Sequence, residues 1–265
     1  MTLLSVNLNK VAHLRNTRHL NIPDVMQAVA VSVNAGAGGI TVHPRPDRRH
    51  IRPHDVYDIA DFLKDHPGVE FNIEGNPFEG TDEAGYMRLV RATRPTQCTL
   101  VPDDPGVFTS CQGWDPAKSA DRLRPIIQEL KELGCRVSLF MDPDPEKIAA
   151  AADLQCDRIE LYTEPYAAAF AQPDRVAVTE QYTRAAQTAQ DHGLGVNAGH
   201  DLNQSNLAHL LGHVPGILEV SIGHALVAEA LFDGLEATVR AYLRIIAGVV
   251  GNGAVREKTQ ESNFR

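Results

Sequence analysis

The chain has 265 residues, of which 43% are hydrophobic and 22% charged, a composition typical of a folded globular protein. Its formal net charge of −9 disfavours a general nucleic-acid-binding role, and no apolar run approaches the roughly 20 residues that cross a bilayer. We therefore expect no nucleic-acid partner and no membrane partner. Because the chain enters a strand-like run at Leu3 without a basic segment or a cleavage site, we expect a cytoplasmic protein.

The cysteines indicate neither a redox pair nor a zinc knuckle. No two of them have the C-x-x-C spacing that such sites use, since they stand at Cys98, Cys111, Cys135 and Cys156. We expect them to be reduced, and we expect Cys135 and Cys156 to be small, partly buried residues.

Short apolar runs alternate with longer helix-like stretches from one end of the chain to the other. Eight runs are predicted to be strands, at residues 3–8, 39–43, 69–74, 96–101, 136–141, 158–162, 194–197 and 217–222. A polar loop is predicted after the first run, and helices are predicted at 23–35, 53–64, 82–93, 117–133, 145–152, 175–192, 204–211 and 225–246. Gly134 and Gly193 follow two of these helices, as C-terminal glycines do.

This alternation predicts an α/β fold, a single-domain (β/α)8 TIM barrel with extra helical segments over residues 1–250, followed by a polar C-terminal tail at 251–265. The main alternative is an open doubly wound sheet. No G-x-G-x-x-G follows the first strand, which counts against a dinucleotide site of that kind. The glycine-rich segment 36–39 follows a helix and precedes a strand, so it is predicted to be a loop and not a phosphate cradle.

A strongly basic loop follows the second predicted strand. The segment 43–50 reads His-Pro-Arg-Pro-Asp-Arg-Arg-His, which places three arginines and two histidines close together. Such a loop is suited to holding the phosphate or carboxylate of a small molecule. A solvated charged loop is the alternative interpretation of the same segment.

Polar residues mark the ends of most of the predicted strands, which in a TIM barrel gather at the catalytic face. They are Asn7, Asn9 and Lys10 at the first strand, His43 at the second, Glu74 at the third, Glu160 within the sixth, His200 and Asp201 after the seventh, and Gly223 and His224 after the eighth. The last two loops are the usual phosphate site of such a barrel, where a glycine lets backbone N–H groups approach an anion.

Three other functions compete with this interpretation. Histidines that converge on one mouth also suit a metal ion, but the first strand lacks the H-x-H of barrel metal hydrolases, so we expect no metal. A Schiff-base lyase or aldolase would use Lys10, the lysine at a strand end. A non-catalytic barrel that binds phosphorylated ligands would not need three titratable groups such as His43, Glu74 and His200.

Motifs along nearly the whole chain resemble those of the pyridoxine 5′-phosphate synthase family of vitamin B6 biosynthesis. The most specific is Gly39-Ile40-Thr41-Val42-His43, followed by Asp-Arg-Arg-His-Ile at 47–51. The others lie in the same order as in the family, at 5–7 with 14–18, then 72–74, 100–102, 137–140, 159–161, 196–200 and 222–225.

The resemblance implies a metal-independent enzyme without a cofactor. Its reaction would condense the phosphorylated small molecules 1-deoxy-D-xylulose 5-phosphate and 3-amino-2-oxopropyl phosphate to pyridoxine 5′-phosphate, phosphate and water. It also implies a homo-oligomer, an octamer in the family. The catalytic residues that it implies are His43 as general base, Glu74 as general acid/base, His200 as proton donor and Glu160 as the group that stabilises developing charge.

The resemblance also implies two sets of substrate contacts. Arg45, His50 and Ser110 would hold the deoxyxylulose phosphate, and the amino ketone phosphate would be held by Asn7, Arg18, Gly223 and His224. Asn9, Lys10 and Asp201 stand where many members of the family have other residues. We expect these three to contact substrate as well, Lys10 through its charge and Asp201 through its backbone N–H.

Overall fold

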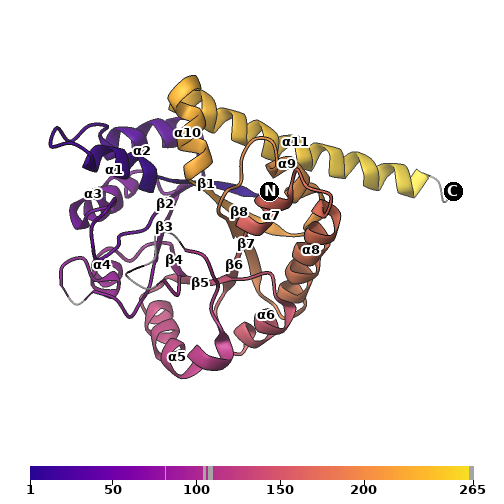
Figure 1. The fold of residues 1–265 in the computed structure, drawn as a ribbon, viewed down its shortest axis with the longest axis horizontal. Coiled ribbons are helices and arrows are strands. Elements are labelled where there is room, and N and C mark those ends of the chain that lie inside the picture. Colours follow the sequence, from indigo (N-terminus) through magenta and orange to yellow (C-terminus); the bar gives the residue numbers. More distant parts are fainter. Residues whose placement is uncertain (81, 104–105, 107–109, 263–265) are drawn as a thin grey trace.

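The structure, a computed structural model, describes residues 1–80, 82–103, 106 and 110–262. Eight parallel strands form a closed barrel in sequence order, because each strand pairs with the next and the last pairs with the first. Figure 1 shows the helices arranged around these strands. The predicted (β/α)8 barrel with extra helical segments is therefore confirmed.

The strands are β1 (Leu3–Asn7), β2 (Gly39–Val42), β3 (Glu70–Gly75), β4 (Gln97–Leu100), β5 (Arg136–Met141), β6 (Arg158–Tyr162), β7 (Gly195–Gly199) and β8 (Ile217–Ile222). The helices are α1 (Asn9–Asn16), α2 (Val25–Asn34), α3 (Pro53–Leu63), α4 (Tyr86–Thr93), α5 (Pro116–Glu132), α6 (Pro145–Ala152), α7 (Glu164–Ala169), α8 (Arg175–Asp191), α9 (Leu207–His213), α10 (His224–Asp233) and α11 (Leu235–Ser262).

The helix predictions were wrong in three places. One is α7, which lies between two predicted elements where no helix was expected. The segment predicted as a polar loop after β1 forms α1, whose buried face consists of Val11, Ala12 and Arg15. Since one of these three is an arginine, the face shows little apolar periodicity. The helix predicted as one element at 225–246 is two helices, because Gly234 adopts φ +83° and ends α10. The second of them, α11, continues to Ser262.

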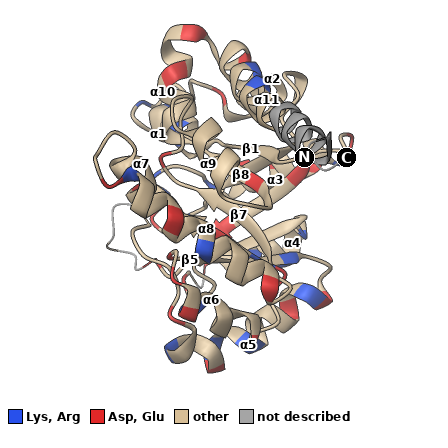
Figure 2. Ribbon diagram, turned by 90° about the vertical axis from the view of Figure 1, so that its right-hand side faces the viewer, with Lys and Arg blue, Asp and Glu red and all other residues tan. Residues whose placement is uncertain are grey.

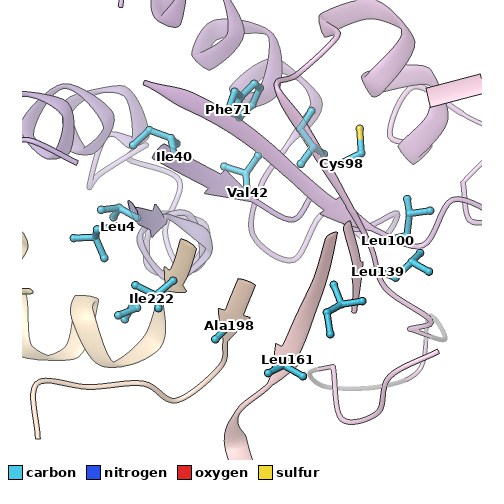
Figure 3. Packing of buried hydrophobic residues seen from close by; sticks show 14 of the residues in the cluster. Leu4, Ile40, Val42, Phe71, Cys98, Leu100, Leu139, Leu161, Ala198 and Ile222 are labelled. Carbon is cyan, nitrogen blue, oxygen red and sulfur yellow. The ribbon is translucent and has the colours of Figure 1, made fainter. Parts of the chain in front are cut away.

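The main apolar core lies between the barrel and its helices. Figure 3 shows part of it, with side chains such as Leu4, Ile40, Val42 and Phe71 from the first three strands. These four are at most 4% exposed. Burying an aliphatic or aromatic side chain of this size stabilises the fold by roughly 1.5–3 kcal/mol. The outer face of the sheet is therefore what holds the helices in place.

The inside of the barrel is polar instead. A TIM barrel is usually filled by branched apolar side chains, but here Ser5 Oγ lies 2.6 Å from Thr41 Oγ1. Asn72 then donates a 3.4 Å hydrogen bond to Thr41 and accepts one of 3.0 Å from the Thr99 hydroxyl. These groups are buried at no more than 2% exposure, so they depend on one another for hydrogen bonds.

A charged network fills the amino end of the barrel. Glu219 accepts hydrogen bonds from Gln97 (3.1 Å) and Asn197 (3.2 Å), and its Oε2 lies 3.5 Å from Arg158 Nη1. Burial raises the pKa of Glu219 to about 7, although the charge of Arg158 opposes the shift. Arg136 pairs with Glu70 beside this group. Because this end is filled, an interior site can open only at the carboxyl ends of the strands.

The outer surface carries charges of both signs. In the view of Figure 2, acidic and basic residues are interspersed over the helices without a face of one sign. The described residues on the side seen in this view therefore form no basic stripe of the kind that nucleic-acid-binding proteins carry. Among the described helices, none has both the length and the apolar character that crossing a bilayer requires.

Candidate active site

A cavity of about 290 Å³ lies at the carboxyl ends of the strands. Most of the residues that the sequence predicted for the site line it, namely Asn7, Asn9, Lys10, His43, Arg45, His50, Glu74, Ser110, His200, Asp201, Gly223 and His224. Two predicted residues do not. Glu160 is buried at 1% exposure, and Arg18 is exposed on the chain that follows α1.

The turn from β1 into α1 shapes one wall of the cavity. Asn7 accepts a 3.0 Å hydrogen bond from the backbone N–H of Asn9 and donates one of 3.2 Å to Glu74 Oε2. Asn9 Oδ1 accepts a 2.8 Å hydrogen bond from the backbone N–H of His43. Asn9 was predicted to contact substrate, but its side-chain oxygen is used to hold the end of β2.

His43 and Glu74 face each other across the floor of the cavity. Nδ1 of His43 lies 4.0 Å from Oε2 of Glu74, and the two side chains are 9% and 6% exposed. Burial, and then the charges of His50 and Arg45, lower the pKa of His43 well below its usual value. The imidazole is therefore neutral at neutral pH and can accept a proton, as a general base must.

Glu74 has the opposite perturbation. Burial, followed by the nearby charge of Glu219, raises its pKa to about 8, while hydrogen bonds from Ser221 and Asn7 act against the shift. The Ser221 hydroxyl lies 3.4 Å from Glu74 Oε1. A carboxyl group with this pKa changes protonation state close to neutral pH, so it can both give and take a proton.

Glu160 lies below the cavity as a second buried acid. Among the described residues, its Oε2 has no hydrogen-bond partner. Burial, and then the charges of Glu74 and Glu219, raise its pKa well above the usual value. A Cβ atom at Gly199 would overlap Oε1 of Glu160, so only glycine leaves room for this carboxyl group. This environment favours the neutral, protonated form of Glu160.

The loop after β7 has an unusual backbone. His200 and Asp201 have φ angles of +82° and +57°, a region that costs non-glycine residues of order 1–3 kcal/mol each. The Thr163 hydroxyl lies 2.6 Å from the His200 carbonyl oxygen. The His200 ring packs against Phe140 and Tyr162, at centroid distances of 5.0 and 5.5 Å. Backbone strain of this kind is concentrated at functional sites.

The neighbouring wall carries the basic side chains of the loop after β2. Arg45 Nη1 lies 3.0 Å from Oδ2 of Asp103, and Ser110 donates a 2.7 Å hydrogen bond to the same oxygen. His50 Nδ1 accepts from the backbone N–H of Ile51 at 3.0 Å. Burial, and then the charge of Arg45, lower the pKa of His50 to about 3, so this ring is neutral.

Several residues of the site were missed from the sequence. Those that line the cavity are His13, Tyr162, Glu164 and Ser221, and Arg49 was predicted only as one of the three arginines of the basic loop at 43–50. Tyr162 and Ser221 could have been found by counting two residues along a strand from Glu160 and Glu219, because alternate residues share a face. His13 could not be found in this way, since it lies on the helix that was predicted as a loop.

No metal centre accompanies these groups in the described part of the chain. Nowhere in it do three or more histidine, cysteine, aspartate or glutamate side chains come together in a way that could hold an ion. The polar groups in the cavity include histidines whose pKa values are lowered, a carboxyl group whose pKa is raised to about 8, and basic side chains. That set is suited to proton transfer on an anionic substrate.

The comparisons with known proteins agree in family and fold. Residues 4–248 match the family described as Pyridoxal phosphate biosynthesis protein PdxJ. The chain is 58% identical over 250 residues to pyridoxine 5′-phosphate synthase of Xanthomonas campestris pv. campestris (strain B100), covering 93% of this chain and 97% of that protein. It is 52% identical over 246 residues to that of Albidiferax ferrireducens, with 93% and 98% covered.

The solved structures that resemble this chain show the fold alone. Tryptophan synthase from Mycobacterium tuberculosis superimposes with a TM-score of 0.62 at 18% identity, covering 94% of this chain and 92% of that chain. The 3-keto-L-gulonate-6-phosphate decarboxylase of Vibrio cholerae has a TM-score of 0.60 at 10% identity, with 93% and 98% covered.

The perturbed Glu160 generates a stability prediction. Its folded-state pKa lies above its unfolded value, so the wild-type protein loses stability as pH rises above about 4.3. Glu160→Gln imitates the neutral acid and removes this loss. We expect its free energy of unfolding to exceed that of the wild type at pH 9 and to differ least from it at pH 4, where the carboxyl group is largely protonated in the unfolded chain as well.

Urea unfolding at the two pH values measures this difference. Glu132→Gln, at an exposed position on α5, is the matched control and should behave like the wild type at both. A Glu160→Gln protein that is less stable than the wild type at pH 9 would show that the carboxyl group is ionised in the folded state.

Proposed function

Because this chain belongs to the pyridoxine 5′-phosphate synthase (PdxJ) family and is an enzyme of vitamin B6 biosynthesis, we propose that it condenses 1-deoxy-D-xylulose 5-phosphate with 3-amino-2-oxopropyl phosphate. The products would be pyridoxine 5′-phosphate, phosphate and water. The observation that carries the proposal is the cavity in which neutral His43, proton-exchanging Glu74 and the buried ring of His200 lie together. The neutral imidazole of His43 and the titrating carboxyl group of Glu74 have the protonation states that imine formation, elimination and ring closure require.

In this mechanism the amine of one substrate attacks the ketone of the other, and water leaves to give an imine. His43 accepts a proton from the reacting carbon or nitrogen, because its imidazole is held neutral. Glu74 returns a proton to the leaving oxygen and takes one back in a later step, as its pKa of about 8 allows. Glu160, a neutral acid near Glu74, stabilises negative charge as it develops.

His200 acts as the proton donor in this scheme. Burial lowers its pKa below the usual value. A phosphate dianion placed beside the ring would favour the protonated imidazolium and would raise that pKa again. In this proposal His200 takes up the proton that it donates when the substrate binds, because the phosphate raises the pKa of the ring.

Two anion sites suit the two substrate phosphates. The first consists of Arg45, His50 and Ser110 in the loops after β2 and β4, and would hold the deoxyxylulose phosphate. The second lies where α10 begins at His224, and the backbone N–H groups and the helix dipole at this N-terminus attract an anion. A Cβ atom at Gly223 would come within 3.1 Å of the Asn7 side chain, so glycine leaves room at the start of α10.

Three other residues were predicted to contact substrate, and the structure places two of them in the cavity and one outside it. Lys10 lines the cavity from the first turn of α1, where its charge can meet a phosphate, and Asp201 lines it after β7. Arg18 is exposed and outside the cavity, so its contact with the amino ketone phosphate rests on the family resemblance.

The protein acts on phosphorylated small molecules, and we propose in addition that it does so as a homo-oligomer in the cytoplasm. Large apolar side chains are exposed on α1, on the chain after it and on α10, which packs against α1. They are Leu14 (45%), Leu20 (70%), Ile22 (61%), Leu231 (69%) and Phe232 (89%). Such exposure is typical of protein interfaces.

The proposed cytoplasmic location rests on the cysteines. Four unpaired cysteines suit a reducing compartment.

A product assay tests the reaction. The protein, incubated with both phosphates after exhaustive EDTA treatment, should release phosphate and form fluorescent pyridoxine 5′-phosphate. Absence of product would contradict the proposed substrates, and an activity that only zinc or manganese restores would contradict a metal-independent reaction. A borohydride-trapped adduct on Lys10 would favour the Schiff-base alternative.

Glu74→Gln tests the role of the carboxyl group. The amide keeps the size and hydrogen bonding of the side chain but cannot exchange a proton. We expect kcat to fall by roughly 10²–10⁴-fold with little change in KM and an unchanged thermal melt. Glu236→Gln on the exposed surface is the matched control. Near-normal kcat combined with a lower melting temperature would make Glu74 a structural residue.

The oligomer is tested at Phe232, the most exposed apolar side chain on α10. Light scattering should give a multiple of the 28.9 kDa chain mass for the wild type and a smaller assembly for Phe232→Ser. Val176→Ser on α8 removes an apolar side chain that is 62% exposed and should leave the mass unchanged. A monomeric wild type would contradict this proposal.

A further inference from the structure

Asp103 holds two of the side chains that are proposed to bind a substrate phosphate. Arg45 Nη1 lies 3.0 Å and Ser110 Oγ 2.7 Å from Oδ2 of Asp103, so both donors converge on one carboxylate oxygen. Both donors also line the cavity. A phosphate oxygen presents the same chemistry to these groups as a carboxylate oxygen does, namely a negatively charged acceptor.

The Arg45–Asp103 pair is buried, and a hydrogen bond from Asn76 holds the backbone of Asp103. The side chains of Arg45 and Asp103 are each 4% exposed. Asn76 donates a 2.9 Å hydrogen bond to the backbone carbonyl of Asp103, which keeps the start of this loop in place. Away from water, a guanidinium without a counter-charge would be costly, and Asp103 supplies that charge while no substrate is bound.

The hydrogen-bond inventory makes Asp103 and a phosphate mutually exclusive at Ser110. A serine hydroxyl has one proton to donate, and here Asp103 receives it. A phosphate dianion also needs donors, so Ser110 can serve it only after turning away from Asp103. At Arg45 the two anions would stand close together in a poorly solvated site, where their repulsion is strong.

We propose that Asp103 is an internal anion that competes with the substrate phosphate for Ser110 and Arg45, and that it thereby sets the affinity of this site. This inference rests on the proposed function, since it takes Arg45 and Ser110 as ligands of a phosphate. Asp103 itself is a specificity-determining residue and not a catalytic one. If it merely positioned the two donors, its removal would weaken phosphate binding, so the two roles predict changes of opposite sign.

Binding of inorganic phosphate distinguishes the two roles. Titration calorimetry on the full chain should show that Asp103→Asn binds phosphate roughly tenfold more tightly than the wild type. Asp82→Asn is the matched control, because Asp82 pairs with an arginine of the same loop but is exposed. Its affinity should be that of the wild type. Thermal melts of each variant with and without phosphate verify folding and give the same ranking.

A double-mutant cycle with Ser110→Ala tests the competition directly. When the hydroxyl is absent, the gain from Asp103→Asn should shrink by more than half, because one of the two contested donors is gone. Equal gains in both backgrounds would overturn the part of the proposal that concerns Ser110. Weaker or unchanged phosphate binding by Asp103→Asn, or no binding by either protein, would overturn the whole of it.

These outcomes are separate from the proposed reaction. A wild type that forms no pyridoxine 5′-phosphate while Asp103→Asn still binds phosphate more tightly would contradict the reaction and support the competition. If the wild type is active but the variant binds phosphate less tightly, the reaction stands and Asp103 is a positioning residue.

Discussion

The polar interior of the barrel is the constraint on which the rest of the structure depends. Groups buried there must find partners inside the protein, because water does not solvate them freely. At the amino end this need is met by pairing, as Arg158 and Arg136 surround Glu219. Towards the carboxyl end no arginine reaches Glu74 or Glu160 in the described structure. The pKa values of these two carboxyl groups are raised instead, so that the protonated form is favoured at the bottom of the cavity.

In the cavity, basic side chains lie on the loops and helix starts, and buried carboxyl groups lie deeper, on the strands. Arg45, Lys10 and His224 lie at its rim, on loops and helix starts, whereas Glu74 projects from a strand. A phosphorylated molecule would be held by its anionic end at the rim and would present its carbon chain to the floor. The same charges also tune the bases, because Arg45 contributes to the lowered pKa of both His43 and His50.

Several contacts outside the proposed reacting groups hold the site in place. Asn9 bonds to the backbone at His43, and Thr163 supports the left-handed segment at His200. Gly199 leaves the space that Glu160 occupies. Asn9, Thr163 and Gly199 thus fix the positions of His43, of the segment at His200 and of Glu160, which are the groups proposed to take part in the reaction. Preorganisation of this kind is what allows a proton to be transferred over a short distance.

The sequence by itself determined the alternation of strands and helices, and hence the barrel and the strand ends where His43, Glu74 and His200 stand. Local periodicity and glycine stops are enough for this, because they depend on residues close together in the chain. Only the tertiary structure decided that α1 is a helix, that Asn9 holds β2, and that Asp103 faces Arg45. The contact of Asn9 with His43 spans 34 positions of the chain, and that of Arg45 with Asp103 spans 58, so local sequence patterns do not reveal them. The pKa shifts likewise depend on burial that only closure of the barrel creates.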